Sequence, residues 1–251
     1  MTRLIYGLLA LAALVIGSQD AAGQARTVRL ASATLGADRI FAVLLPSGYA
    51  ESEQRYPVVY LFHGGGQDHT AFMARTGFTP MARRHDVIVV MPAADRNYSG
   101  LGAEGQRRFN DFVASELVDY VDSHYRTIAT PEGRAIAGLS MGGGIAAMTA
   151  LQHPRRFGMV GAFSAALHGD LETAVRDAGG SPTYFYVSCG TSDSLVTASR
   201  QFVARLAEHK LGHEFREIAG GEHAWNVWDP EIATFFDLLF TRAPWHAAAQ
   251  R

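Results

Sequence analysis

The sequence predicts an α/β fold in which a mostly parallel sheet carries helices on both faces. Short apolar runs of strand length alternate with longer segments whose apolar residues recur at helical spacing. Several of the short runs are continuously apolar, which is typical of parallel strands buried on both faces. The chain has 251 residues, of which 48% are apolar and 18% charged, so it is long enough for one large domain with a substantial core.

Composition and charge exclude several functional classes. The chain has 22 basic and 24 acidic residues, so its net charge of −2 gives no general attraction for nucleic acid or for an anionic membrane. The single cysteine, Cys189, excludes an internal disulfide and a zinc site built from cysteines. We expect no nucleic-acid partner, and nothing in the composition indicates an oligomeric state.

The first 25 residues are typical of a secretory signal. Arg3 precedes an uncharged stretch, residues 4–16, and Gly23 and Ala25 suit a cleavage after Ala25. The stretch is shorter than the roughly 20 apolar residues that a spanning helix needs, although an uncleaved anchor is the alternative. We therefore expect a secreted or periplasmic bacterial protein without a stable membrane anchor.

The strands expected after this segment are short and apolar. They cover residues 28–32, 40–45, 58–62, 87–91, 134–138, 159–163, 184–188 and 213–218. A turn near Gly36 joins the first two strands, and Pro46 and Pro92 end the second and the fourth. Polar residues that follow parallel strands are expected to gather at the carboxyl edge of the sheet, where ligands bind in folds of this kind.

Helices are expected between the strands. They cover residues 71–84, 109–124, 142–152, 171–178, 196–210 and 231–240. The helix 142–152 ends near Pro154, and the connection 92–108 is glycine-rich and polar, which indicates a rim. Without a linker or repeat, the chain divides into a signal (residues 1–25), one domain (residues 26–242) and a tail (residues 243–251).

The strongest motif is the pentapeptide Gly138-Leu139-Ser140-Met141-Gly142. It follows an expected strand and precedes an expected helix, as the nucleophile elbow of an α/β-hydrolase fold requires. The turn is so tight that side chains at positions 138 and 142 would collide with neighbouring backbone. The turn presents the Ser140 hydroxyl at a helix amino end, where developing negative charge is stabilised.

A second motif, His63-Gly64-Gly65-Gly66, directly follows the expected strand 58–62. Such a loop can turn backbone N–H groups toward a substrate oxygen and so form half of an oxyanion hole, with the Met141 amide as the other half. We favour Gly65 as the donor, while Gly64 and Gly66 remain alternatives.

A serine nucleophile needs a neutral imidazole that is oriented by a carboxylate. His223 follows the last expected strand, and Asp193 follows the strand before it. The order Ser140, Asp193, His223 is the chain order of this fold. Two rival acids fit less well: Glu222 adjoins His223, so the two side chains point apart, and Asp170 lacks the matching glycine turn.

Other positions give weaker indications. Asn97, Tyr98 and Trp225 are candidate substrate contacts, since they follow strand ends or the expected base. His209 and His213 have a metal-ligand spacing, but Gly212 lies between them and no carboxylate has a matching spacing, so we expect no metal site.

Taken together, these residues resemble the family known as "Putative esterase", a branch of the α/β-hydrolases that includes esterase D-like enzymes, feruloyl esterases and mycolyltransferases. The matching segments are residues 45–49, 56–64, 137–143, 153–157 and 223–225. The resemblance implies an α/β-hydrolase fold and a carboxylic ester hydrolase with a Ser-His-Asp triad and no cofactor. The 20 residues 164–183 are too few for a separate cap domain, so we expect short or compact acyl esters, small molecules in solution, as substrates.

Two alternative functions remain open from the sequence. One is acyl transfer to a sugar or lipid hydroxyl, which differs from hydrolysis only in how the pocket excludes water and binds an acceptor. The other is a non-catalytic binding protein on a hydrolase scaffold.

Overall fold

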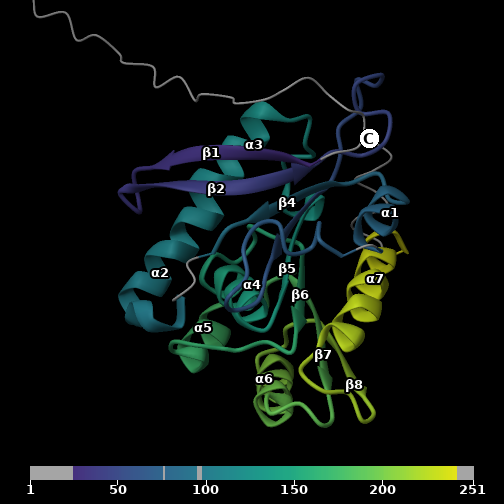
Figure 1. The fold of residues 1–251 in the computed structure, drawn as a ribbon. Coiled ribbons are helices and arrows are strands. Elements are labelled where there is room, and N and C mark those ends of the chain that lie inside the picture. Colours follow the sequence, from purple (N-terminus) through teal and green to yellow (C-terminus); the bar gives the residue numbers. More distant parts are fainter. Residues whose placement is uncertain (1–24, 76, 95–97, 242–251) are drawn as a thin grey trace, which may run out of the picture.

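The fold is that of a computed structural model, which describes residues 25–75, 77–94 and 98–241. Within these residues, eight strands form one sheet in the order β1-β2-β4-β3-β5-β6-β7-β8 (Figure 1). The strands are β1 (Arg26–Ser32), β2 (Ala37–Leu44), β3 (Val58–Phe62), β4 (Ile88–Pro92), β5 (Arg134–Leu139), β6 (Met159–Phe163), β7 (Tyr184–Gly190) and β8 (His213–Ile218). Strand β2 is antiparallel to β1 and to β4, and the pairs from β4 to β8 are parallel, which confirms the mostly parallel sheet.

Helices cover both faces of the sheet, as expected. They are α1 (Phe78–Arg83), α2 (Gly102–Phe112), α3 (Val118–His124), α4 (Met141–Gln152), α5 (Leu171–Asp177), α6 (Val196–Glu208) and α7 (Trp225–Thr241). Helices α1 and α7 pack on one face, while α2 to α6 lie on the other (Figure 1). The central strands β3, β4, β5 and β6 are buried along their whole length between these layers, which explains their continuous apolar runs.

Two expected helices and one expected connection have different bounds in the structure. The expected helix 71–84 is confined to α1, because residues 71–75 form turns. The expected helix 231–240 begins earlier, at Trp225, so Pro230 lies inside α7. The connection expected over residues 92–108 is shorter than predicted, since a 3-10 helix (Tyr98–Leu101) and the first turns of α2 occupy its second half.

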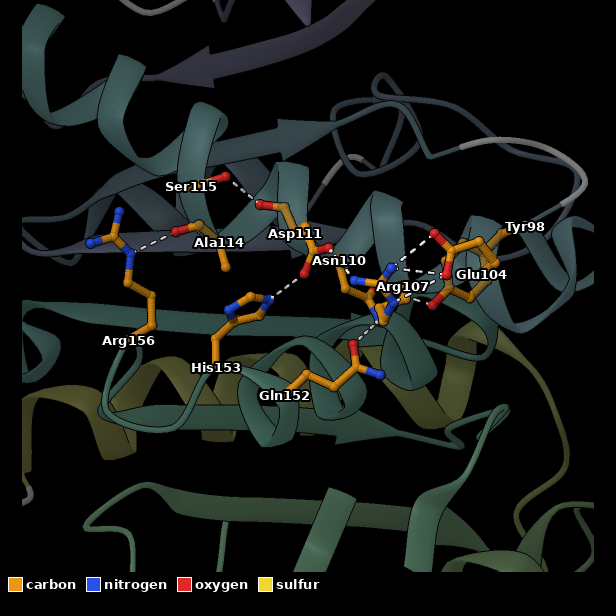
Figure 2. A network of polar contacts seen from close by, with 10 residues as sticks. All are labelled: Tyr98, Glu104, Arg107, Asn110, Asp111, Ala114, Ser115, Gln152, His153 and Arg156. Atoms are coloured by element: carbon orange, nitrogen blue, oxygen red, sulfur yellow. Dashed lines mark hydrogen bonds and ion pairs between the residues drawn. The ribbon is translucent and has the colours of Figure 1, made fainter. Parts of the chain in front are cut away.

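The long helical segment after β4 contains an irregular turn. A π-helical turn, Val113–Leu117, separates α2 from α3. The side chain of Arg156 lies beside this turn, and its Nε donates a hydrogen bond of 2.6 Å to the carbonyl of Ala114 (Figure 2). One turn away, His153 Nε2 lies 3.1 Å from Asp111 Oδ1. Through these two contacts, the 153–157 segment between α4 and β6 holds the irregular helical segment against the body of the domain.

The connection between β6 and β7, residues 164–183, contains the short helix α5 and no other helix. This agrees with the expected absence of a separate cap domain. Among the described residues, no helix has the length and apolar character to cross a membrane. The expected signal (residues 1–25) lies outside the described residues except for Ala25, and so does the expected tail (residues 243–251).

Candidate active site

Ser140 occupies a sharp turn between β5 and α4. Its backbone has φ 54° and ψ −119°, a conformation that residues with side chains rarely adopt. A Cβ added at Gly138 would lie 2.4 Å from the Gly142 backbone, and one at Gly142 would lie 2.3 Å from the Phe62 carbonyl oxygen. The steric need for glycine at both positions, expected from the sequence, is thereby confirmed.

The structure brings Ser140, His223 and Asp193 into one chain of hydrogen bonds. His223 Nε2 lies 2.9 Å from Ser140 Oγ, and His223 Nδ1 lies 2.7 Å from Asp193 Oδ2. Because the carboxylate can only accept, we assign the proton to Nδ1, which leaves Nε2 to accept from the serine hydroxyl. This is the arrangement that a serine nucleophile, its base and an orienting acid require.

Two neighbouring loops position the acid and the base. Asp193 follows β7 and His223 follows β8, and the Ser192 amide donates a 2.9 Å hydrogen bond to the Gly221 carbonyl between them. Of the rival acids, Asp170 caps α5 by accepting from the Thr173 amide at 3.0 Å. Glu222 is exposed to solvent.

The Asp193 carboxylate is buried and surrounded by hydrogen-bond donors. Its side chain has 0% exposure, whereas that of His223 keeps 36%. Burial by itself would raise the pKa of Asp193, but hydrogen bonds from the Leu195 amide, the Ser164 hydroxyl and His223 together lower it below the ordinary aspartate value. The carboxylate is therefore held ionised beside the imidazole.

The glycine loop after β3 is fixed by two side chains, His63 and Gln67, to which the sequence analysis assigned no role. The buried His63 ring accepts from the Ala94 amide at Nε2 (3.0 Å) and lies 2.8 Å from the Gly64 carbonyl at Nδ1. The Gly64 amide donates to Gln67 Oε1 at 3.0 Å. Since the Gly64 amide is occupied, the next amides, Gly65 first, are better placed to serve a substrate. A polar residue at each end of a glycine run is the signal that could have indicated these supports.

The Met141 amide belongs to the first turn of α4, where N–H groups have no acceptor within the helix. The Gly144 amide is the first to bond back along the helix, to the Ser140 carbonyl at 3.1 Å. The 64–66 loop lies beside the nucleophile, since a Cβ built on Gly64 would be 3.7 Å from Ser140 Cβ. The oxyanion-hole role of Gly65 and Met141 stays a prediction that this arrangement favours.

The candidate substrate contacts have different surroundings. Tyr98 is 1% exposed and donates a 3.1 Å hydrogen bond to Asn110 Oδ1, so it has almost no surface to offer a substrate. Trp225 is half-buried, with ring contacts to Phe72 and Trp228 at 5.6 Å each. Asn97 lies outside the described residues. No cluster of three metal-ligating side chains occurs among the residues that the structure describes.

Comparison with known proteins agrees with this geometry. The model of the family described as "Putative esterase" matches residues 32–237, so the chain belongs to that family. The eight-stranded, mostly parallel sheet and the likeness to solved esterase structures confirm the α/β-hydrolase fold. An esterase of Mycobacterium tuberculosis, Rv1288, is 30% identical over 236 residues, which cover 71% of this chain and 51% of that protein. The chain thus spans about half of that relative's length.

Two further similarities concern smaller proteins. An acetyl esterase of Caldicellulosiruptor saccharolyticus is 24% identical over 219 residues, covering 72% of this chain and 82% of that protein. The structure of a CE1 ferulic acid esterase from Anaeromyces mucronatus, in complex with ferulic acid, has a TM-score of 0.72 and 21% identity. It covers 88% of this chain and 93% of that one. At this identity the structural likeness shows the fold.

Proposed function

We propose that this protein is a serine carboxylic ester hydrolase that works through an acyl-enzyme. The observation that carries the proposal is the continuous hydrogen-bonded chain from Ser140 Oγ through His223 to Asp193. The membership of the "Putative esterase" family supports the same reaction class. A non-catalytic scaffold has no need for a strained serine aligned with a histidine and a buried carboxylate.

In the proposed mechanism, Ser140 Oγ attacks the ester carbonyl while His223 Nε2 takes its proton. Asp193 holds the imidazole and stabilises the imidazolium. The amides of Met141 and Gly65 stabilise the oxyanion, and such a donor is worth on the order of 10²–10³ in kcat. His223 then gives the proton to the leaving alkoxide, and the alcohol departs. Water, activated by His223, attacks the acyl-enzyme and releases the acid and Ser140.

We propose short or compact acyl groups as substrates. The 36% exposure of the His223 side chain and the short β6–β7 connection indicate an open site without a deep tunnel. Relatives named for acetyl and feruloyl esters agree with small acyl groups. Hydrolysis is favoured over acyl transfer because an open site gives water free access to the acyl-enzyme.

We also propose export, on the basis of the segment 1–25. Expression in a bacterium, followed by amino-terminal sequencing of the periplasmic and medium fractions, should give a chain that begins at Arg26. Recovery of the full-length chain from the membrane fraction would instead identify an uncleaved anchor.

A fluorophosphonate probe tests the reaction class. The protein should be labelled on Ser140, as located by mass spectrometry of peptides, because only an activated serine attacks the probe. Ser140→Ala is the control and should not be labelled. An unlabelled wild-type protein that is folded by circular dichroism would contradict the proposed function.

A further inference from the structure

Ser164, the residue directly after β6, has a backbone conformation that its residue type does not favour. Its φ is 44°, in the left-handed region that glycine enters without cost. The residue is 0% exposed, and its amide donates a 2.7 Å hydrogen bond to the Ser188 carbonyl on the neighbouring strand β7. A serine that occupies a position suited to glycine suggests a role for the side chain.

The hydroxyl of Ser164 lies between an obligatory donor and an obligatory acceptor. Trp228 Nε1 donates to Ser164 Oγ at 3.0 Å, and an indole N–H can only donate. The hydroxyl therefore accepts from the tryptophan and keeps its own proton to donate. A hydrogen bond from Ser164 is among the causes that lower the pKa of the buried Asp193 carboxylate, so we assign this proton to Asp193. The order of donors and acceptors is fixed along this path from Trp228 to the acid.

Trp228 also contacts the base. Its ring meets the His223 ring edge to face, with the centroids 4.8 Å apart and an interplanar angle of 87°. One indole thus touches His223 directly and reaches Asp193 through Ser164. The carboxylate also accepts from the Leu195 amide on Oδ1, at 2.9 Å, and from His223 on Oδ2, and the buried Cys189 thiol is a further hydrogen-bonding neighbour. Since the Asp193 side chain has 0% exposure, solvent cannot replace a lost donor without rearrangement.

We propose that Ser164 and Trp228 are positioning residues that fix the Asp193 carboxylate, and through it the His223 imidazole, in the geometry needed to activate Ser140. The inference rests on the proposed function. It predicts an effect on kcat and not on KM, because the two residues act on the reacting geometry and not on the ester. Small displacements of such groups cost up to about 10²-fold in rate.

Two variants of Ser164 separate the hydroxyl from the backbone. Ser164→Ala and Ser164→Gly both remove the hydroxyl, but only the glycine also removes the strain of the left-handed backbone conformation. We expect kcat to fall roughly 10- to 100-fold in both variants with KM within twofold. The melting temperature of Ser164→Gly should equal or exceed that of Ser164→Ala. Ser32→Ala is the control, because Ser32 is another buried serine and lies on the edge strand β1, far from the site in the strand order. Its hydroxyl accepts a 3.0 Å hydrogen bond from the Leu35 amide. Ser32→Ala should lower the melting temperature and leave kcat unchanged.

Trp228→Phe removes the indole N–H and keeps an aromatic ring beside His223. In this variant kcat should fall, but by less than in the Ser164 variants. Combined with Ser164→Ala it should add less than twofold, since the N–H acts only through the hydroxyl. The proton on His223 Nδ1, observed by NMR at low field, should shift in Ser164→Ala and Ser164→Gly and not in Ser32→Ala.

The outcomes distinguish this inference from the proposed function. If wild type and both Ser164 variants react with the fluorophosphonate at equal rates and kcat stays within twofold, Ser164 has no positioning role and only this inference fails. The same conclusion follows if kcat changes in parallel with the melting temperature, so that the more stable Ser164→Gly has a kcat close to wild type while that of Ser164→Ala is low. If the folded wild-type protein is not labelled, both proposals fall together.

Discussion

At the residue scale, Ser140, His223 and Asp193 are expected to act as a unit, because each contacts the next at 2.7–2.9 Å. Ser140→Ala or His223→Ala should lower kcat by roughly 10⁶-fold, and Asp193→Asn by roughly 10⁴-fold. Double variants should lose little more than the worst single variant. Steady-state kinetics on an activated acetyl ester measures this. A near-normal rate for Asp193→Asn would place the orienting acid elsewhere.

The lowered pKa of Asp193 makes a second residue-scale prediction, about stability and pH. Burial opposes the ionised form, but the amide, hydroxyl and imidazole donors outweigh it. The folded chain then binds this proton less tightly than the unfolded chain, in which an aspartate has a pKa of about 3.9. Asp193 should therefore stabilise the fold fully above about pH 4, and this contribution should be lost as the pH falls through its lower folded value.

Melting temperatures of wild type and Asp193→Asn between pH 7 and pH 2.5 test this sign. The difference in melting temperature between the two proteins should become smaller below about pH 4, where Asp193 loses its charge. The other carboxylates are common to both proteins and do not contribute to this change. A gap that stays constant to the lowest pH would mean that Asp193 is not held ionised by its donors.

The same residues show what a sequence can predict of a site. Ser140, Asp193 and His223 could be placed because each follows an apolar strand, and the carboxyl ends of parallel strands meet at one edge. Ser164 could not, because its partner Trp228 lies on a distant segment of the chain that only the fold brings close. Tyr98 follows a strand end too, yet it turns into the core to reach Asn110. The position of a residue just after a strand predicts that it lies at the carboxyl edge of the sheet. The direction of its side chain depends on the conformation of the loop, which the sequence pattern does not give.

At the element scale, the accuracy of the expected helices depended on their glycine and proline residues. The expected start at Phe109 was late, because Gly102 and Gly105 are poor helix formers that nonetheless begin α2. The expected start at Glu231 was late as well: α7 begins at Trp225, whose ring packs on Trp228 one turn later, and Pro230 lies inside the helix. Packing of the two tryptophans thus outweighs the local preference. All eight strands were predicted to within a few residues, including the central strands β3, β4, β5 and β6, which are buried on both faces.

The 153–157 segment makes a prediction at this scale. Arg156 donates to the Ala114 carbonyl at the π-helical turn (Figure 2). It also pairs with Asp119. Arg156→Met should lower the free energy of unfolding by about 1–3 kcal/mol, since a buried carbonyl loses its partner while the aliphatic stem is kept. Chemical denaturation measures the loss, and kcat well below the melting temperature should not change.

The neighbouring Arg155→Met is the matched control, because the Arg155 side chain is exposed. It should stay within about 0.5 kcal/mol of wild type, as surface substitutions do. Equal destabilisation by both variants would show that charge near α4, and not the contact with Ala114, accounts for the effect.

At the scale of the whole molecule, the cover over Ser140 decides which acyl chains fit. The β6–β7 connection contains α5, a helix of 7 residues, as its only regular element, so it cannot form a lid with its own core. The helical second half of the β4–α2 connection buries Tyr98 against Phe109, so it belongs to the body of the domain. His223 keeps 36% of its side chain exposed. Ser140 therefore faces an open rim formed by strand-end loops.

An open rim limits the gain from a longer acyl chain. Each buried methylene contributes about 0.8 kcal/mol, and the gain ends where the chain leaves the protein surface. We expect kcat/KM to be highest for acetyl to butyryl or similarly compact acyl groups, with no further rise toward palmitoyl. Without an apolar lid to open, activity should not jump above the micelle threshold of the substrate. A series of p-nitrophenyl esters, measured below and above that threshold, tests both statements. A steady rise with chain length, or a jump at the interface, would mean that the described loops fold over Ser140 to form a covered apolar channel.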